Sequence, residues 1–380
     1  MSDYQQSYEE IPAIVRNNRD VEHIVYASCR YGHHGFGRKN KDKLFSMLVS
    51  TDMHHCPAQL AQTIAYLNYH APLDCGICIG DILAADFRES ADWYAEGVAL
   101  SQKPFFTALG NHDLGNSPDA ALAATTQMSF DKIIRPVADK IGIDGLSVPY
   151  YVKHFEQYKI SLVVLHSFDT PDELAPDGNY AIHRGVLMHS QAQIDWLIDT
   201  LQGIPADHHL LIAMHAYPYR HTVVEGPWSQ PGRRLDQTNG LNAYGDTDLL
   251  SDIIHAWSKG EACHGRYTPV RDDLPTIAVD CDFSARGEGQ FAAYLIGHYH
   301  RDILAKNEKY PDQNIIAFVC SAADDWQSYD NDLPRAEGTK AQDALTVCSV
   351  DTDKREIRLV RVGSNVTMEM TERTYTVVHY

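Results

Sequence analysis

Aspartate and histidine side chains follow several apolar stretches of this sequence, beginning with STDMHHC at residues 50–56. Asp52 and His54 come directly after the apolar run LFSMLV, and residues two apart on a strand point to the same face. These two side chains are not expected in a hydrophobic core, because burying an unpaired charge costs free energy. The spacing therefore predicts that both side chains converge on one target, for which a metal ion is the simplest candidate.

Four later apolar runs end in the same way, with the motifs IGD, LGNHD, AMHAYPY and IGHYHRD. These motifs contain Asp81, then Asn111, His112 and Asp113, then His215, and finally His298 and His300. A single aspartate after a strand more often caps the next helix. Several strand ends together form the edge of an α/β sheet where ligands bind. The five motifs therefore predict one composite site.

The mixture of imidazoles and carboxylates suits Mn, Fe or Zn better than Mg alone. Seven candidate ligands are too many for one tetrahedral site, but they match two metals that share a bridging carboxylate. Two ions about 3.5–4 Å apart can clamp the attacking and leaving oxygens of a displacement at phosphorus. We therefore expect two divalent or trivalent transition-metal ions as cofactors.

The segments that carry these motifs alternate between strand-like and helix-like patterns, and the last third of the chain is rich in strands. This order predicts mixed sheets packed between helices. We expect an N-terminal extension at 1–43 with a strand at HIVYAS (23–28). We also expect a main domain at 44–363, with a long helical region from Asp119 to about Lys140. Within that domain, 216–290 is read as a functional insertion, and 364–380 as a C-terminal tail or strand.

Composition limits the partners of this chain of 380 residues. The formal net charge of −19 disfavours long nucleic acid, because it repels phosphate backbones. The N-terminal residues lack the pattern of a signal peptide, and no apolar run approaches the length of a membrane span. These features predict a cytoplasmic protein with no membrane partner, while the oligomeric state stays open.

Eight cysteines are scattered along the chain without a compact framework. Cys75 and Cys78 lie in an apolar strand-like run, where residues three apart face opposite sides, so we interpret them as core residues. Cys263, His264 and Cys281 could form a structural zinc site, but their spacing matches no metal motif. We interpret these three as unrelated to metal binding.

The order DxH, GD, GNHD, H and GHxH resembles the calcineurin-like metallophosphoesterases, and every element is present here in sequence. The resemblance covers residues 44–363. The closing stretch EGTKAQDALTVCSVDTDKREIRLVRVG also resembles bacterial and phage members of that family. The resemblance implies a four-layer α/β/β/α sandwich of two mixed β-sheets flanked by helices, with a dinuclear metal site at the C-terminal ends of strands.

The same resemblance implies a role for each matched residue. The first metal would be held by Asp52, His54 and His300, the second by Asn111, His215 and His298, and Asp81 would bridge them. A hydroxide held between the metals would be the nucleophile, and His112 the general acid at the leaving oxygen. Asp113 would either orient a neighbouring imidazole or cap a helix.

The function expected from these residues is the hydrolysis of a small phosphodiester. Two alternatives remain at this stage. One is a phosphomonoesterase acting on a small molecule, since the same motifs serve both reactions. The other is a binding or scaffold protein that keeps the fold without catalysis, although such proteins typically lose metal ligands or the general-acid histidine.

Overall fold

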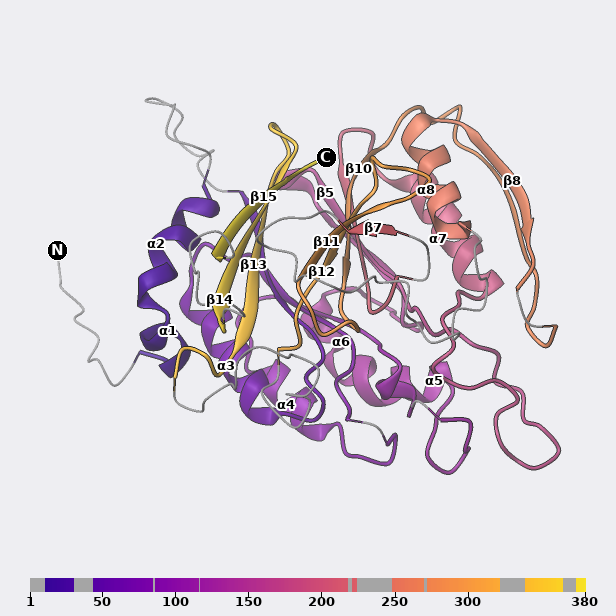
Figure 1. Ribbon diagram of the computed structural model, residues 1–380, viewed down its shortest axis with the longest axis horizontal. Helices are drawn as coiled ribbons and strands as arrows, with labels where there is room; N and C mark the ends of the chain where they lie inside the picture. The colour runs from indigo at the N-terminus through magenta and orange to yellow at the C-terminus, as the bar shows by residue number, and fades with distance from the viewer. Residues whose placement is uncertain are drawn as a thin grey trace.

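The structure, a computed structural model, describes residues 11–30, 44–84, 86–115, 117–217, 221–223, 248–269, 272–321, 339–364 and 374–380. Its described strands form two large mixed sheets, called sheet A and sheet B here, and a separate two-stranded hairpin. The sheets pack face to face with helices on both outer sides (Figure 1). The predicted four-layer α/β/β/α sandwich is confirmed.

Sheet A follows the order β15 (Tyr375–His379), β14 (Glu356–Gly363), β13 (Ala344–Asp351), β1 (Phe45–Ser50), β2 (Cys75–Ile79) and β3 (Phe105–Ala108). Strands β1, β2 and β3 are parallel, and β13 runs antiparallel to β1. The strand β2 is buried along its whole length. A strand covered on both faces is typically a continuous apolar run, which explains the sequence CGICI.

Sheet B follows the order β4 (Tyr151–Phe155), β5 (Ile160–Val164), β6 (His209–Met214), β10 (Gln290–Ile296), β12 (Asn314–Ala317), β11 (Ile303–Asn307) and β7 (His221–Val223). The four strands β5, β6, β10 and β12 are parallel to one another. Their carboxyl ends therefore lie along one edge, as do those of β1, β2 and β3 in sheet A.

Two hydrophobic layers hold the sandwich together. The alternation along β6 shows both, because Leu211 and Ala213 belong to the cluster shared with sheet A, whereas Leu210, Ile212 and Met214 belong to the cluster on the outer side. Successive residues of a strand point to opposite faces, so one strand serves both layers.

Helices cover the two outer faces. Against sheet A lie α1 (Ala13–Asn17), α2 (Arg19–Ser28), α3 (Pro57–Tyr69), α4 (Asp92–Ala99) and the short helix α6 (Ala138–Ile141), which contacts β3. The short helix α5 (Thr126–Ser129) lies against the turn at His112–Leu114 that follows β3. Against sheet B lie α7 (Gln191–Gly203), α8 (Leu249–Lys259) and the hairpin of β8 (Ala262–Tyr267) and β9 (Ile277–Asp282) (Figure 1). Among the described helices, none combines the length and apolarity that a membrane crossing requires.

A buried ion pair connects the two sheets near the site. Arg361 of β14 bonds to Asp302, in the segment that links β10 to β11, and both side chains are almost fully buried. The same carboxylate accepts the backbone N–H of Val319 at 3.0 Å. The segment after β10 is thereby fixed to sheet A, although β10 itself belongs to sheet B.

Two sequence-based expectations about local structure were wrong. The segment HIVYAS lies in helix α2 rather than in a strand, because Val21, Val25 and Ser28 form a buried stripe at helical spacing. The long helical region expected from Asp119 to about Lys140 is broken into short helical turns that begin at Thr126.

Parts of the predicted extension, insertion and tail are described. Residues of α1 and α2, including Ile14 and Val25, are buried in the cluster between helices and sheet A. The insertion at 216–290 contains α8 and the β8–β9 hairpin, while 218–220, 224–247 and 270–271 lie outside the described residues. Within 364–380, β15 pairs with β14.

The close approach of Gly76 to Phe105 gives a stability prediction. A Cβ at Gly76 would lie 2.6 Å from the Phe105 ring and 2.9 Å from Leu67. We expect Gly76→Ala to lower the free energy of unfolding by about 1–3 kcal/mol, because overpacking forces buried neighbours to move. Urea denaturation measures this change.

Gly203→Ala is the matched control, since a Cβ at Gly203 meets nothing within 4 Å. This variant should unfold at the same urea concentration as the unaltered protein or at a higher one. Equal stability of both variants would show that the contact with Phe105 relaxes without cost.

Candidate metal centre

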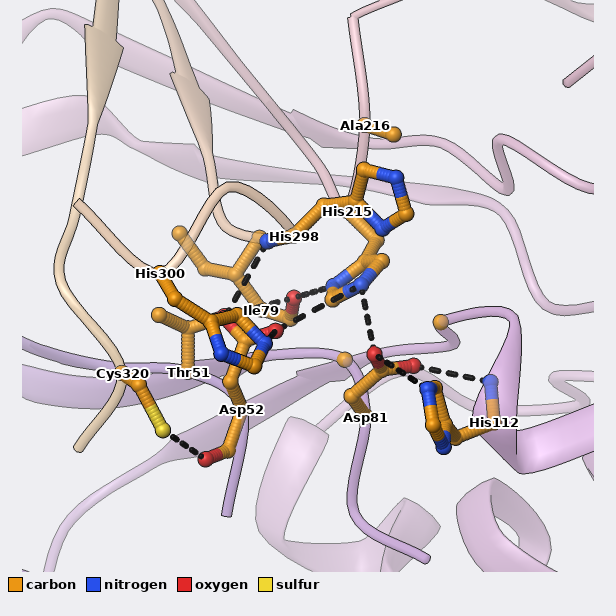
Figure 2. Close-up of polar contacts among 12 residues, drawn as sticks. Thr51, Asp52, Ile79, Asp81, His112, His215, Ala216, His298, His300 and Cys320 are labelled. Atoms are coloured by element: carbon orange, nitrogen blue, oxygen red, sulfur yellow. Dashed lines mark hydrogen bonds and ion pairs between the residues drawn. The ribbon is translucent and has the colours of Figure 1, made fainter. Parts of the chain in front are cut away.

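The candidate site lies where the parallel strands of both sheets end. Asp52, Asp81 and Asn111 follow β1, β2 and β3 of sheet A, whereas His215 follows β6 and the pair His298 and His300 follows β10 of sheet B. Figure 2 shows the imidazoles of His215, His298 and His300 around the carboxylates of Asp52 and Asp81. Residues from five strand ends thus meet at one edge, as the motifs predicted.

Asp52, His54, Asp81 and His300 form a first group of possible ligands. Each offers one ligand atom, and these atoms all lie within 4.8 Å of one another. The Nε2 atom of His300 is 3.1 Å from Asp52 Oδ1 and 3.1 Å from His54 Nε2. This spacing places two imidazoles and two carboxylates around a common centre.

Asp81, His215 and His298 form a second group, with ligand atoms that are also within 4.8 Å of one another. His215 Nε2 lies 3.0 Å from Asp81 Oδ2 and 3.7 Å from Asp52 Oδ1. Its Nδ1 is 2.6 Å from the carbonyl oxygen of Ile79, so Nδ1–H donates there and Nε2 faces the site. Asp81 belongs to both groups, which is the position that a bridging ligand requires.

Asn111 adds an acceptor that has no partner among the described residues. The residue is 5% exposed, and Oδ1 is buried without a hydrogen bond. The next residue, His112, donates its backbone N–H to Asp81 Oδ1 at 2.9 Å, which places Asn111 beside the shared carboxylate. A buried, unpaired acceptor is costly, and a cation would satisfy it. The donor set of imidazole, carboxylate and amide oxygen therefore fits transition-metal ions.

The backbone is strained at most of these positions. Left-handed φ angles occur at Asp52 (53°), His54 (43°), Asp81 (53°), His298 (66°) and His300 (52°). Non-glycine residues rarely adopt this conformation, and it persists only where surrounding structure enforces it. Its concentration at five candidate ligands is a signal of function that is independent of the sequence motifs.

The two carboxylates dominate the electrostatics of the site. Burial alone would raise the pKa of Asp52, but His300 and His215 hold it below its usual range, and His215 and His112 do the same for Asp81. Burial lowers the pKa of His215, yet Asp81 and Asp52 outweigh it and raise the value to about 9. The negative charges of Asp52 and Asp81 thus stabilise a positive charge beside them.

Two other imidazoles are held neutral. Burial lowers the pKa of His54 to about 4, and burial together with His215 lowers that of His298 to about 3. A histidine must be neutral to coordinate a metal. His54 and His298 can therefore coordinate a metal without first losing a proton.

Glycines in the motifs allow the strand ends to meet. A Cβ at Gly110 would lie 2.1 Å from Asp81 Oδ1, and one at Gly297 would lie 2.0 Å from Thr51 Oγ1. No real Cβ tolerates such contacts. Gly110 and Gly297 are thus required because the carboxylate of Asp81 and the segment around Asp52 approach the neighbouring backbone.

His112 is one of the partly exposed side chains of the site. Its side chain is 14% exposed, and its Nε2 is 3.9 Å from Asp81 Oδ2. Its Nδ1 bonds to the carbonyl oxygen of Ala84, which orients the ring. Nε2 is therefore the ring nitrogen that faces Asp81.

Asp113 takes neither of the two roles that the sequence left open. Its Oδ1 accepts the N–H groups of Ile82 and Leu83 at 2.8 and 2.9 Å, and its Oδ2 accepts that of Gly110 at 2.8 Å. The carboxylate therefore joins the segment after β2 to the segment after β3. It fixes the backbone that directly follows Asp81 to the backbone at Gly110 rather than orienting an imidazole.

Cys320 is a neighbour of the site that the sequence analysis did not identify. It follows β12, and its Sγ, His54 and His300 offer ligand atoms within 4.8 Å of one another. The sulfur lies 2.9 Å from the carbonyl oxygen of Asp52 (Figure 2). Its place after a strand parallel to β10 was the available signal, but a cysteine in an apolar run is indistinguishable from a core residue.

Comparison with known proteins agrees with this geometry. The sequence pattern of the family described as Calcineurin-like phosphoesterase matches residues 45–302. The chain therefore belongs to the calcineurin-like phosphoesterase family, and the predicted resemblance is confirmed. No curated protein gives a significant match to the chain.

Solved structures resemble the chain at low sequence identity. The protein TT1561 of Thermus thermophilus is 9% identical, with 89% of this chain and 99% of that chain covered and a TM-score of 0.40. Phosphopantetheinyl hydrolase from Mycobacterium tuberculosis is 10% identical, with 73% and 90% covered and a TM-score of 0.39. At these values the likenesses carry no argument about activity.

Metal content tests the proposed ligands. We expect about two transition-metal ions per chain, and we expect Asp52→Ala to lose bound metal because it removes a buried carboxylate that faces three imidazoles. Elemental analysis of protein purified in metal-supplemented buffer measures both.

Cys75→Ala is the control, because Cys75 is buried at the start of β2, at the opposite end of the strand from Asp81. Its metal content should equal that of the unaltered protein. Full metal content in Asp52→Ala, or loss in Cys75→Ala, would contradict the assignment.

Proposed function

We propose that the protein is a metal-dependent phosphoesterase that hydrolyses a small phosphodiester. The observation that carries the proposal is the position of Asp81, whose carboxylate belongs to both groups of candidate ligands and also accepts the N–H of His112. One carboxylate thus joins two possible metal positions to a possible general acid.

We assign Asp52, His54 and His300 to the first metal, Asn111, His215 and His298 to the second, and Asp81 to both. Two Mn, Fe or Zn ions bound there would activate water as a nucleophile and stabilise the phosphoryl oxygens. The chain itself supplies the geometry: Ile79 orients His215, and Asp113 fixes the backbone that carries Asp81.

His112 is assigned the role of general acid. Its ring is oriented by the Ala84 carbonyl, and its partly exposed side chain places Nε2 3.9 Å from Asp81 Oδ2. A proton on Nε2 can pass to the oxygen of the departing alcohol as the bond to phosphorus breaks. The need for this proton grows with the basicity of the leaving group.

The preference for a diester rests on charge. The ion-pair partners recorded for Asp52 and Asp81 among the described residues are imidazoles, and the chain carries a net charge of −19. A diester brings one negative charge to this site, whereas a monoester brings up to two. The same charge disfavours long nucleic acid, so a small substrate is proposed. The cytoplasmic location remains a prediction.

A pair of chromogenic substrates tests the reaction. Metal-loaded protein should hydrolyse bis(p-nitrophenyl) phosphate at least about tenfold more efficiently, as kcat/KM, than p-nitrophenyl phosphate, which has the same leaving group. The reverse order would favour a phosphomonoesterase. Bound metal without turnover of either ester would favour a non-catalytic binding protein.

A second prediction concerns His112. His112→Ala should lower kcat on an alkyl phosphodiester by about 10²–10⁴-fold while metal content is unchanged, since the departing alkoxide then lacks its proton donor. The loss should be smaller for a p-nitrophenyl ester, whose leaving group is stable without a proton. Steady-state kinetics on both esters measures the difference.

His264→Ala is the matched histidine control, because His264 is exposed on β8 and pairs with Asp280 at 2.6 Å. Its kinetics should equal those of the unaltered protein. An equal loss on alkyl and p-nitrophenyl esters in His112→Ala would argue against proton donation and for a role in substrate binding.

A further inference from the structure

Two cysteines that are distant in sequence face each other in the hairpin outside sheet B. Cys263 of β8 and Cys281 of β9 are direct partners in the antiparallel register. Residues directly opposite in such a pair have Cα atoms about 4.5–5.5 Å apart. A disulfide requires a Cα separation of about 4.4–6.8 Å. The backbone is therefore spaced for a disulfide without rearrangement, although both thiols are free here.

His264, the third member of the possible zinc site, points elsewhere. It pairs with Asp280 at 2.6 Å, and both are neighbours in sequence of the two cysteines. Successive residues of a strand face opposite sides, so His264 cannot join the two sulfurs. The structure separates the imidazole from the thiols and leaves a dithiol.

The hairpin is held in place by helix α7. The Gln191 side chain accepts the N–H of Ala278 and donates to its carbonyl oxygen, both at 2.8 Å. Gln202 donates to the carbonyl oxygen of Asp282 at 2.8 Å. The strand β9 is therefore fixed near both ends, which keeps Cys281 opposite Cys263.

The two thiols differ in exposure and acidity. Cys281 is 6% exposed and belongs to the hydrophobic cluster under the hairpin, whereas Cys263 is half-buried. The Cys281 thiol, as a hydrogen-bond donor, lowers the pKa of Cys263 to about 7. The same contact and burial raise the pKa of Cys281. The accessible sulfur is thus the more acidic one, which is the arrangement of an attacking thiol and a resolving thiol.

We propose that Cys263 and Cys281 are a redox site that a small-molecule disulfide oxidises to a cross-strand disulfide. The Cys263 thiolate, its proton released to solvent, attacks one sulfur of the small disulfide and expels the first small thiolate. The Cys281 thiol then loses its proton, attacks Cys263 Sγ and expels the second. Two protein thiols are oxidised, and one disulfide is reduced to two thiols.

Oxidised glutathione is the probe for the experiment. The reduced protein, incubated with it and digested after the remaining thiols are blocked, should yield a peptide pair joined through Cys263 and Cys281. The intact chain should lose two hydrogen atoms and retain no glutathione. A stable glutathione adduct on Cys263, disulfides between other cysteines, or no oxidation would overturn the proposal.

Single variants separate the two roles. Cys281→Ala should accumulate glutathione on Cys263, because the resolving thiol is missing, whereas Cys263→Ser should stay unmodified at the buried Cys281. Cys56→Ser is the matched control, since it changes another cysteine of intermediate exposure and should form the same disulfide. Modification of Cys281 in Cys263→Ser would contradict the assigned order.

The pH dependence of alkylation gives a measurement on the unoxidised protein. The thiolate is the reactive form, so the rate at Cys263 should rise with pH through a midpoint near a pKa of about 7 in the unaltered protein. Cys281→Ala removes the donor and should move the midpoint upward, towards the value of an ordinary thiol. An unchanged midpoint would show that the two thiols do not interact.

Discussion

The structure depends on the electrostatic problem posed by two buried carboxylates, Asp52 and Asp81. Neither can be desolvated without compensation, and the chain surrounds them with imidazoles rather than with lysine or arginine among the described residues. An imidazole can donate a proton to a carboxylate or a lone pair to a metal. The same side chains can therefore balance the charge with or without bound cations.

This arrangement constrains the fold around it. The carboxylates belong to sheet A, whereas His215, His298 and His300 belong to segments that leave sheet B, so the site exists only where the sheets meet. Five of the candidate ligands have a left-handed backbone conformation, which non-glycine residues rarely adopt. The surrounding structure therefore enforces this conformation, and with it the positions of the side chains.

Much of this could be predicted from the sequence, because parallel strands place their carboxyl ends at one edge whatever lies between them. Asp52, Asp81 and His215 were predicted from this rule applied to all the strand-end motifs together. The helix α2 was not, because its β-branched residues favour a strand locally, and packing against the core decides otherwise. Cys320 was missed because its exposure to the site depends on the path of the chain after β12. The contact of Cys263 with Cys281 depends on hairpin register, which the sequence does not specify.

The ion pair between Arg361 and Asp302 has a consequence for the distance between the two proposed metals. Sheet A carries most of the ligands proposed for the first metal, and sheet B carries most of those proposed for the second. The ion pair is a buried connection between β14 of sheet A and the segment that follows His300. The separation of the two proposed metal positions would then depend on how the sheets are stacked and not on loop conformation alone. Conservative changes deep in the inter-sheet layer, far from any candidate ligand, would consequently shift the two groups of ligands relative to each other and act on the proposed activity as well as on stability.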